Sequence, residues 1–201
     1  MESFLPKKGN YRKLLPFQKA ECIFDITDHF VKRFLKKGDR TIDQMYQAAR
    51  SGKQNIAEGC SAAATSSETE IRLINVAKAS LQELLLDYED YLRVRGLEQW
   101  STDDERTIKT REIGKRHNDS AFYRDAIPLR SDETIANIAI TLLHQEDYLL
   151  RKLLERLEDD FVKQGGIKEM MFKARTEYRQ KMNGANQKPD DKKKTDGNKK
   201  D

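Results

Sequence analysis

The sequence predicts an all-α protein built on a helical bundle. Its hydrophobic and charged shares are nearly equal, at 37% and 36%, a balance typical of helices that bury a narrow apolar stripe and expose a wide polar face. Apolar residues recur at steps of three and four along several stretches of the chain, which is the spacing of one helix face. A length of 201 residues suits one domain with appendages.

The first predicted helix spans about residues 16–36 and follows a basic arm at residues 1–15. Pro16 suits its first turn, where a missing N–H costs nothing. Gly38 follows a lysine-rich last turn and ends the helix. The expected buried face consists of Ala20, Ile23, Phe24, Thr27, Phe30, Val31 and Phe34.

The second predicted helix spans about residues 41–58. Ala49 and Gly52 lie on its buried stripe, so we expect a neighbouring helix to approach closely there and to offset the cost of a mid-helix glycine. Thr41 is the expected cap of this helix, as Ser131 is of the fourth long helix.

The third predicted helix spans about residues 66–95 and begins at a capping box. Either Ser67 with Glu70 or Ser66 with Thr69 fits that motif, and the two pairs differ by one residue in register. A heptad step predicts the buried face, which consists of Ile74, Ala77, Leu81, Leu84, Tyr88 and Tyr91.

In residues 97–130 apolar residues are sparse and do not recur at steps of three and four, and charged residues are frequent. We therefore expect an insert that packs loosely over the bundle. Within it, about 103–115 is a candidate helix. A fourth long helix is predicted at about 132–163 and a shorter fifth helix at about 167–182. The predicted organisation is a basic arm (1–15), a four-helix core (16–165) that contains the charged insert (97–130), a suffix helix (166–183) and a disordered Lys/Asp tail (184–201).

No pattern in the sequence predicts an enzyme active site, and we expect no cofactor. There is no G-x-S-x-G elbow and no P-loop. His29, His117 and His144 do not form the Glu-x-x-His pairs of a di-metal bundle, so we expect no metal site. Cys22 and Cys60 form no pair motif, and no run approaches the roughly 18 apolar residues of a membrane span. We therefore predict a non-enzymatic, cytoplasmic protein.

Positive charge is concentrated at the front of the chain. The net charge is +4, and residues 1–60 carry twelve Lys or Arg against seven Asp or Glu. Lys and Arg on one surface are sufficient to contact a phosphate backbone, although solvated faces and cations that complement a helix dipole also account for such residues. The candidate nucleic-acid contacts are Arg12, Lys13, Lys19, Lys32, Arg33, Lys36, Lys37, Arg40, Arg50 and Lys53.

The segment from Gln44 to Arg93 carries a family resemblance. The residues that carry this resemblance are the run Asn55-Ile56-Ala57-Glu58-Gly59, followed by Glu70, Ala77, Ser80, Leu81 and Glu83. With these residues the chain resembles a bacterial four-helix-bundle family that includes proteins encoded by intervening sequences in 23S ribosomal RNA genes. Within that family it is most similar to long-tailed members described as four-helix-bundle suffix-domain proteins. Lys53 departs from the family pattern, because many relatives carry proline there.

The resemblance implies an antiparallel up-and-down four-helix bundle, to which this chain adds a charged insert between helices 3 and 4 and a short fifth C-terminal helix. It also implies a homo-oligomer, since several relatives are homopentameric rings. A related branch, the accessory variability determinant of diversity-generating retroelements, is a basic pentamer that partners a reverse transcriptase and binds nucleic acid. RNA, DNA and a protein partner such as a reverse transcriptase are the partners that follow from it. In a ring of five, a modest basic patch is repeated five times.

Two interpretations of the function stay open. In the first, an oligomeric scaffold binds an RNA or DNA backbone through a basic face of helices 1 and 2. In the second, the chain is a protein–protein interaction module whose fifth helix docks a partner through its Met170–Met171 face. The residues Asn55, Glu58 and Gly59 are interpreted as a structural motif at the end of helix 2, because no nucleophile or metal set accompanies them.

Overall fold

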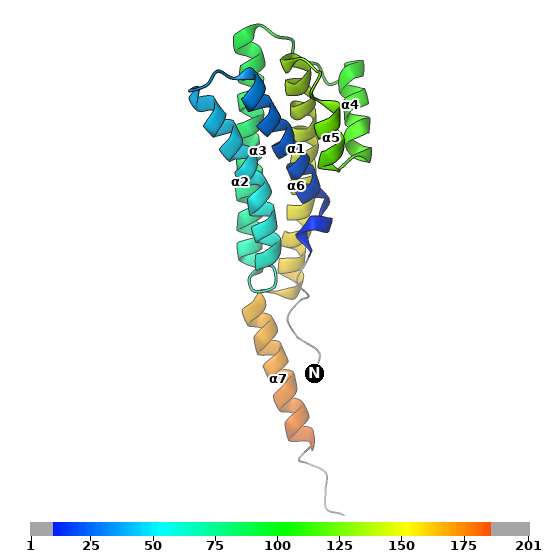
Figure 1. Ribbon diagram of the computed structural model, residues 1–201. Helices are drawn as coiled ribbons and strands as arrows, with labels where there is room; N and C mark the ends of the chain where they lie inside the picture. Colours follow the sequence, from blue (N-terminus) through cyan, green and yellow to red (C-terminus); the bar gives the residue numbers. More distant parts are fainter. Residues whose placement is uncertain (1–9, 186–201) are drawn as a thin grey trace, which may run out of the picture.

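The computed structural model describes residues 10–185, and all regular structure within that range is helical (Figure 1). The prediction of an all-α protein is thereby confirmed. In chain order the elements are the 3-10 turn η1 (Tyr11–Lys13) and the helices α1 (Leu15–Phe34), α2 (Arg40–Ala62), α3 (Ser67–Arg95), α4 (Glu105–Arg116), α5 (Ser120–Ala126), α6 (Asp132–Gln164) and α7 (Ile167–Ala185).

Four long helices, α1, α2, α3 and α6, surround one apolar core. α1 packs against α2 and α6, and α3 packs against the same two helices, so the four close into a ring of neighbours (Figure 1). The predicted buried face of α3 is confirmed, whereas Phe24 and Phe34 of the predicted α1 face are only partly buried against the core. The most deeply buried apolar side chains include Ile23, Ile26, Phe30, Met45, Ile56, Ile74, Leu84, Tyr88 and Ile135.

Short polar side chains set the helix starts. Ser66 accepts the Thr69 N–H at 3.1 Å, which selects one of the two capping registers expected for α3. Ser131 caps α6, as predicted. Asp39 replaces Thr41 as the cap of α2, because its carboxylate accepts the Thr41 N–H at 2.9 Å and begins that helix one residue earlier.

Gly52 lies at a close contact between helices, as the sequence predicted. A Cβ atom added to Gly52 would lie 2.5 Å from the Cδ2 and Cγ atoms of Leu81 in α3. The absence of a side chain therefore lets α2 and α3 approach closely, and the packing gained offsets the low helix propensity of glycine.

The expectation that residues 97–130 pack loosely is wrong. α4 packs on α6 and α5 packs on α1, and the side chains of Tyr123 and Ile127 are part of the buried core. Polar contacts also hold α5, since Asp25 of α1 accepts from Ser120 Oγ at 2.6 Å and from Arg124 Nη1 at 2.7 Å. A few apolar residues are sufficient to pack α4 and α5 against the long helices, because each of these short helices buries only one face.

The predicted N-terminal arm and C-terminal tail are only partly covered by the described residues. The basic arm is described only from Asn10 onward, and the tail at 184–201 lies outside the described residues except for its first two, which end α7. Figure 1 shows α7 extending past the end of α6, away from the other helices. Among the described helices, none is both long enough and apolar enough to span a membrane.

Candidate functional site

The ten basic residues predicted to contact nucleic acid do not form one continuous face. Arg12 and Lys13 belong to η1, before α1, whereas Lys36, Lys37 and Arg40 lie where α1 ends and α2 begins. These two groups are separated by the length of α1, which is about 30 Å for a helix of 20 residues. Arg50 is exposed in the middle of α2.

The prediction for Lys19 must be corrected, because this side chain is buried. It is 2% exposed, and its Nζ donates a hydrogen bond to the backbone oxygen of Gly114 in α4. Burial lowers the pKa of Lys19, and the nearby Cys22 and Glu146 oppose that shift. Lys19 therefore fixes the position of α4 on α1 and is not available at the outer surface.

Three further predicted cations are engaged within the protein. Lys32 forms an ion pair with Asp28 one turn earlier in α1, at 2.7 Å. Arg33 donates to the backbone oxygen of Pro128. Lys53 lies over the ring of Phe24, with its Nζ 4.0 Å from the ring centroid. All three remain at least partly exposed, but contact with a phosphate would have to compete with these partners.

Three of the basic residues without a side-chain partner lie close together in the chain at the α1–α2 turn, whereas Lys13 and Arg50, which also lack one among the described residues, lie elsewhere. Lys36, Lys37 and Arg40 are exposed and form no ion pair or side-chain hydrogen bond within the described residues. Arg95, at the end of α3, lies near this turn, because it helps to lower the pKa of Asp39 after the two hydrogen bonds with Thr41. Its guanidinium also lies over the ring of Tyr91, 3.8 Å from the centroid. We call the set Lys36, Lys37, Arg40 and Arg95 the basic end.

The outer surface between α2 and α3 is acidic rather than basic. A groove there is lined by Asp43 of α2 and by Glu83 and Asp87 of α3. Burial raises the pKa of Asp87, and the neighbouring carboxylates Asp90 and Glu83 raise it further. A polyanion is repelled by such a groove, so the basic end is the better candidate surface for a phosphate backbone.

The Asn55–Gly59 run lies inside α2 and has structural contacts. Asn55 Nδ2 donates to Ser51 of the preceding turn, both to the backbone oxygen at 2.9 Å and to Oγ at 3.1 Å. Glu58 is exposed. The predicted helix end at this run is wrong, because α2 continues to Ala62 and buries Gly59 against α3, where an added Cβ would lie 3.2 Å from Ile74 Cδ1.

The three histidines belong to different parts of the fold: His29 to α1, His117 to the end of α4, and His144 to α6. His117 stacks on Phe122 with a centroid separation of 4.0 Å, and His144 is exposed on α6. His29 is near Arg33, and burial followed by this positive charge lowers its pKa. The described residues contain no cluster of three His, Cys, Asp or Glu side chains with the geometry to hold a metal ion.

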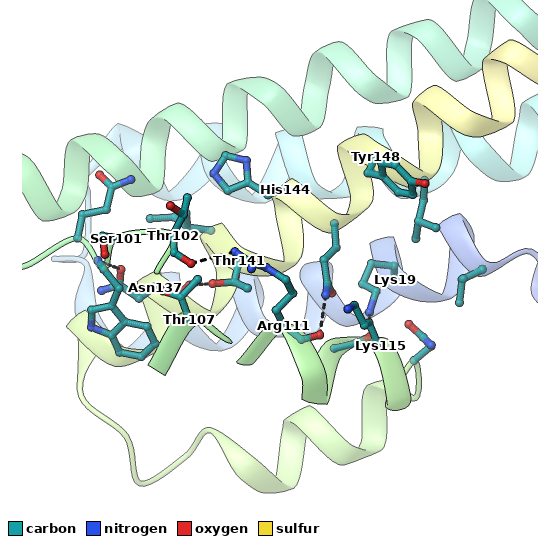
Figure 2. Close-up of a pocket in the computed structure, with 18 residues that line it drawn as sticks. Lys19, Ser101, Thr102, Thr107, Arg111, Lys115, Asn137, Thr141, His144 and Tyr148 are labelled. Atoms are coloured by element: carbon teal, nitrogen blue, oxygen red, sulfur yellow. Dashed lines mark hydrogen bonds between the residues drawn. The ribbon is translucent and has the colours of Figure 1, made fainter. Parts of the chain in front are cut away.

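A large pocket, which the sequence did not predict, lies between the insert and the helices α1 and α6 (Figure 2). Its volume is about 780 Å³. α1 contributes Leu15 and Lys19, the segment after α3 contributes residues 99–102, and α4 and α6 form opposite walls. The wall residues include Thr107, Arg111, Gly114 and Lys115 of α4, and Asn137, Ile140, Thr141, His144, Gln145 and Tyr148 of α6.

A second exposed surface lies along α7. Met171, Ala174, Tyr178 and Met182 recur at steps of three and four and therefore share one helix face. The first, third and fourth of these are exposed, as is the adjacent Phe172 with 73% of its surface accessible. This apolar stripe has no extensive packing against another described helix.

Comparison with protein-family models, with curated proteins and with solved structures found no match to this chain. The resemblance to the 23S ribosomal RNA intervening-sequence family therefore stays a prediction that rests on the residues of the Gln44–Arg93 segment.

Proposed function

We propose that the protein is a non-enzymatic, antiparallel four-helix-bundle scaffold that binds the backbone of RNA or DNA through its basic end. The observation that carries this proposal is the set of exposed cations Lys36, Lys37 and Arg40, which have no internal partner in the described residues. The short links between α1, α2 and α3 and the closed ring of contacts with α6 support an up-and-down bundle.

The basic end suits phosphate contact for a local reason. Lys36 and Lys37 follow the last turn of α1, where cations complement the negative end of the helix dipole. Both lysines are exposed and have no carboxylate partner among the described residues, so their charge faces solvent. If the chain assembles into a homo-oligomer such as the ring of five that the resemblance implies, the same cluster is repeated in each copy. Binding of this kind is salt-dependent and weakly selective for sequence.

A titration of fluorescently labelled single- and double-stranded RNA and DNA at several salt concentrations tests the proposal. Charge reversal of Lys36, Lys37 and Arg40 to Glu is expected to reduce the slope of log affinity against log salt by about 3, because each lost phosphate contact removes roughly one unit. All three positions lie in the α1–α2 turn or at the first residue of α2, so the fold tolerates the change.

The matched control reverses Arg12 and Lys13 at the opposite end of α1. If this control weakens binding as much as the triple variant, the basic end is not the contact surface. Absence of binding by the unmodified protein at micromolar concentration and low salt would refute nucleic-acid binding altogether. Mass measurement in solution gives the oligomer number independently.

The apolar stripe of α7 favours a second function, docking of a protein partner. Met171, Phe172 and Tyr178 are large apolar side chains that lie exposed on α7, and exposed apolar patches often mark interaction sites. Methionine side chains adapt to different partner shapes. Deletion of residues 166–201 would then abolish partner capture while the helical content and thermal unfolding of the remaining chain stay unchanged.

A further inference from the structure

The pocket between α4 and α6 has the size and lining of a small-molecule site. Its volume of about 780 Å³ lies within the range of ligand pockets in other proteins, roughly 300–1,000 Å³. Apolar and aromatic side chains line much of it, among them Leu15, Ile140, Tyr148 and Leu149, together with Trp100. This part of the lining suits a flat apolar group.

The charged groups of the pocket are all of one sign. Lys19, Arg111 and Lys115 line it, and none of its 18 lining residues is Asp or Glu. The whole chain contains 34 acidic residues in 201, so about three would be expected in a random set of that size. Figure 2 shows Arg111 and Lys115 on the α4 side of the pocket, across from His144 and Tyr148.

Arg111 keeps most of its donors available. Its Nη2 donates to the backbone oxygen of Thr102 at 3.3 Å, and it forms no ion pair within the described residues. A guanidinium has five N–H donors in a planar fork that matches a carboxylate or phosphate. Lys115 is exposed at the rim and likewise has no carboxylate partner among the described residues.

Unpartnered buried polar atoms are concentrated around this pocket. The described residues contain seven such side-chain atoms, and four of them belong to residues that line it: Trp100 Nε1, Thr107 Oγ1, Asn118 Oδ1 and Gln145 Oε1. Thr107 is only 7% exposed. Buried polar groups in proteins almost always have a hydrogen-bond partner. Trp100 Nε1 and Thr107 Oγ1 can donate to an anion, whereas Asn118 Oδ1 and Gln145 Oε1 are acceptors and need a donor group on the ligand or a water molecule.

We propose that this pocket binds a small organic anion, composed of a carboxylate or phosphate group attached to a flat apolar body. Arg111 and Lys115 hold the anionic group, and Trp100 and Thr107 donate hydrogen bonds to the bound molecule. Ile140, Tyr148 and Leu149 contact the apolar body. The site is distinct from the basic end and does not depend on nucleic-acid binding.

Trp100 provides a direct readout, because it is the only tryptophan of the chain and lines the pocket. The probe is 8-anilinonaphthalene-1-sulfonate, an aromatic anion that accepts energy from excited tryptophan. We expect saturable transfer from Trp100. N-phenyl-1-naphthylamine has the same rings without the sulfonate, and we expect it to bind at least about tenfold more weakly because it lacks the charge-assisted contacts.

Replacement of Arg111 and Lys115 tests the assignment of the anion contacts. Arg111→Gln and Lys115→Gln are each expected to weaken binding of the anionic probe about tenfold and to leave the neutral probe unchanged. Lys109→Gln is the matched control, since Lys109 is exposed on the same helix and does not line this pocket. Circular dichroism and thermal unfolding of each variant check that α4 remains folded.

Competition by 1-naphthoate and by 1-naphthyl phosphate distinguishes the two anionic groups, with neutral 1-naphthol as the control. Stronger displacement by one of the two anions identifies the group that the pocket prefers. The proposal is overturned if neither displaces the probe, if the neutral and anionic probes bind equally, or if Lys109→Gln has the same effect as Arg111→Gln.

Discussion

Replacement of Glu146 by glutamine is expected to change how stability depends on pH. Glu146 lies in α6, is 0% exposed, and neither of its carboxylate oxygens has a hydrogen-bond partner within the described residues. Burial raises its pKa well above the ordinary value of 4.5; Lys19 opposes this shift and Asp147 adds to it. The folded protein therefore retains a proton on Glu146 at a pH where the unfolded chain has lost it.

The sign of the effect follows from this difference in bound protons. Below pH 4.5 both states hold the proton and Glu146 contributes no pH dependence. Above that value the folded state holds one more proton, so rising pH favours unfolding until the folded-state pKa is passed. In this window the free energy of unfolding of the unmodified protein falls by up to about 1.4 kcal/mol per pH unit through this group.

Urea unfolding followed by circular dichroism at pH 5, 6, 7 and 8 measures the effect. Because His29 also titrates differently in the folded and unfolded states, the useful quantity is the difference between Glu146→Gln and the unmodified protein. The variant should gain relative stability as pH rises. Glu158→Gln, at an exposed position of the same helix, is the control and should show a flat difference. A flat difference for Glu146→Gln as well would refute the assignment of a raised pKa.

Three further predictions concern packing and helix starts. Gly52→Val is expected to destabilise the protein by about 1–3 kcal/mol, because its side chain would overlap Leu81 across the α2–α3 contact; thermal unfolding measures this. Tyr88→Phe removes the buried hydroxyl that donates to Thr27 Oγ1 at 3.0 Å and should lower stability by about 1 kcal/mol, or roughly 2–4 °C in Tm. Ser131→Ala removes the cap of α6 and should cost about 1 kcal/mol in urea unfolding, whereas Ser131→Asp should restore most of it.

The apolar core could be predicted from the sequence because helical period reports burial directly. All six residues of the heptad step in α3, from Ile74 to Tyr91, are buried. The close contact at Gly52 was also predictable, since a glycine on the buried stripe of a helix lowers stability unless a neighbouring helix packs closely against it. The core contribution of the insert was missed, although Tyr123 and Ile127 are one helical turn apart and provided a weak signal.

The polar features could not be predicted, because they depend on contacts between distant parts of the chain. Lys19 has the sequence context of a surface lysine, and only the docking of α4 buries it beneath Gly114. The same docking creates the pocket, since its walls come from α4 and α6 and its end from α1. Likewise, the engagement of Arg33 by the Pro128 oxygen and of Lys53 by the Phe24 ring depends on contacts between different elements.

Lys19 lines the pocket and interacts electrostatically with Glu146, and this coupling leads to a last prediction. Lys19 lines the pocket, Glu146 of α6 and Cys22 of α1 are its charged or titratable neighbours, and α4 presents the Gly114 oxygen to its Nζ. A bound anion favours the ammonium form of Lys19 and so raises a pKa that burial has lowered. Because linkage is reciprocal, protonation of Lys19 must strengthen anion binding by the same factor. Affinity for 8-anilinonaphthalene-1-sulfonate should therefore fall as pH rises through the lowered pKa of Lys19, and the neutral probe should show no such change. Equal pH dependence of the two probes would contradict this coupling.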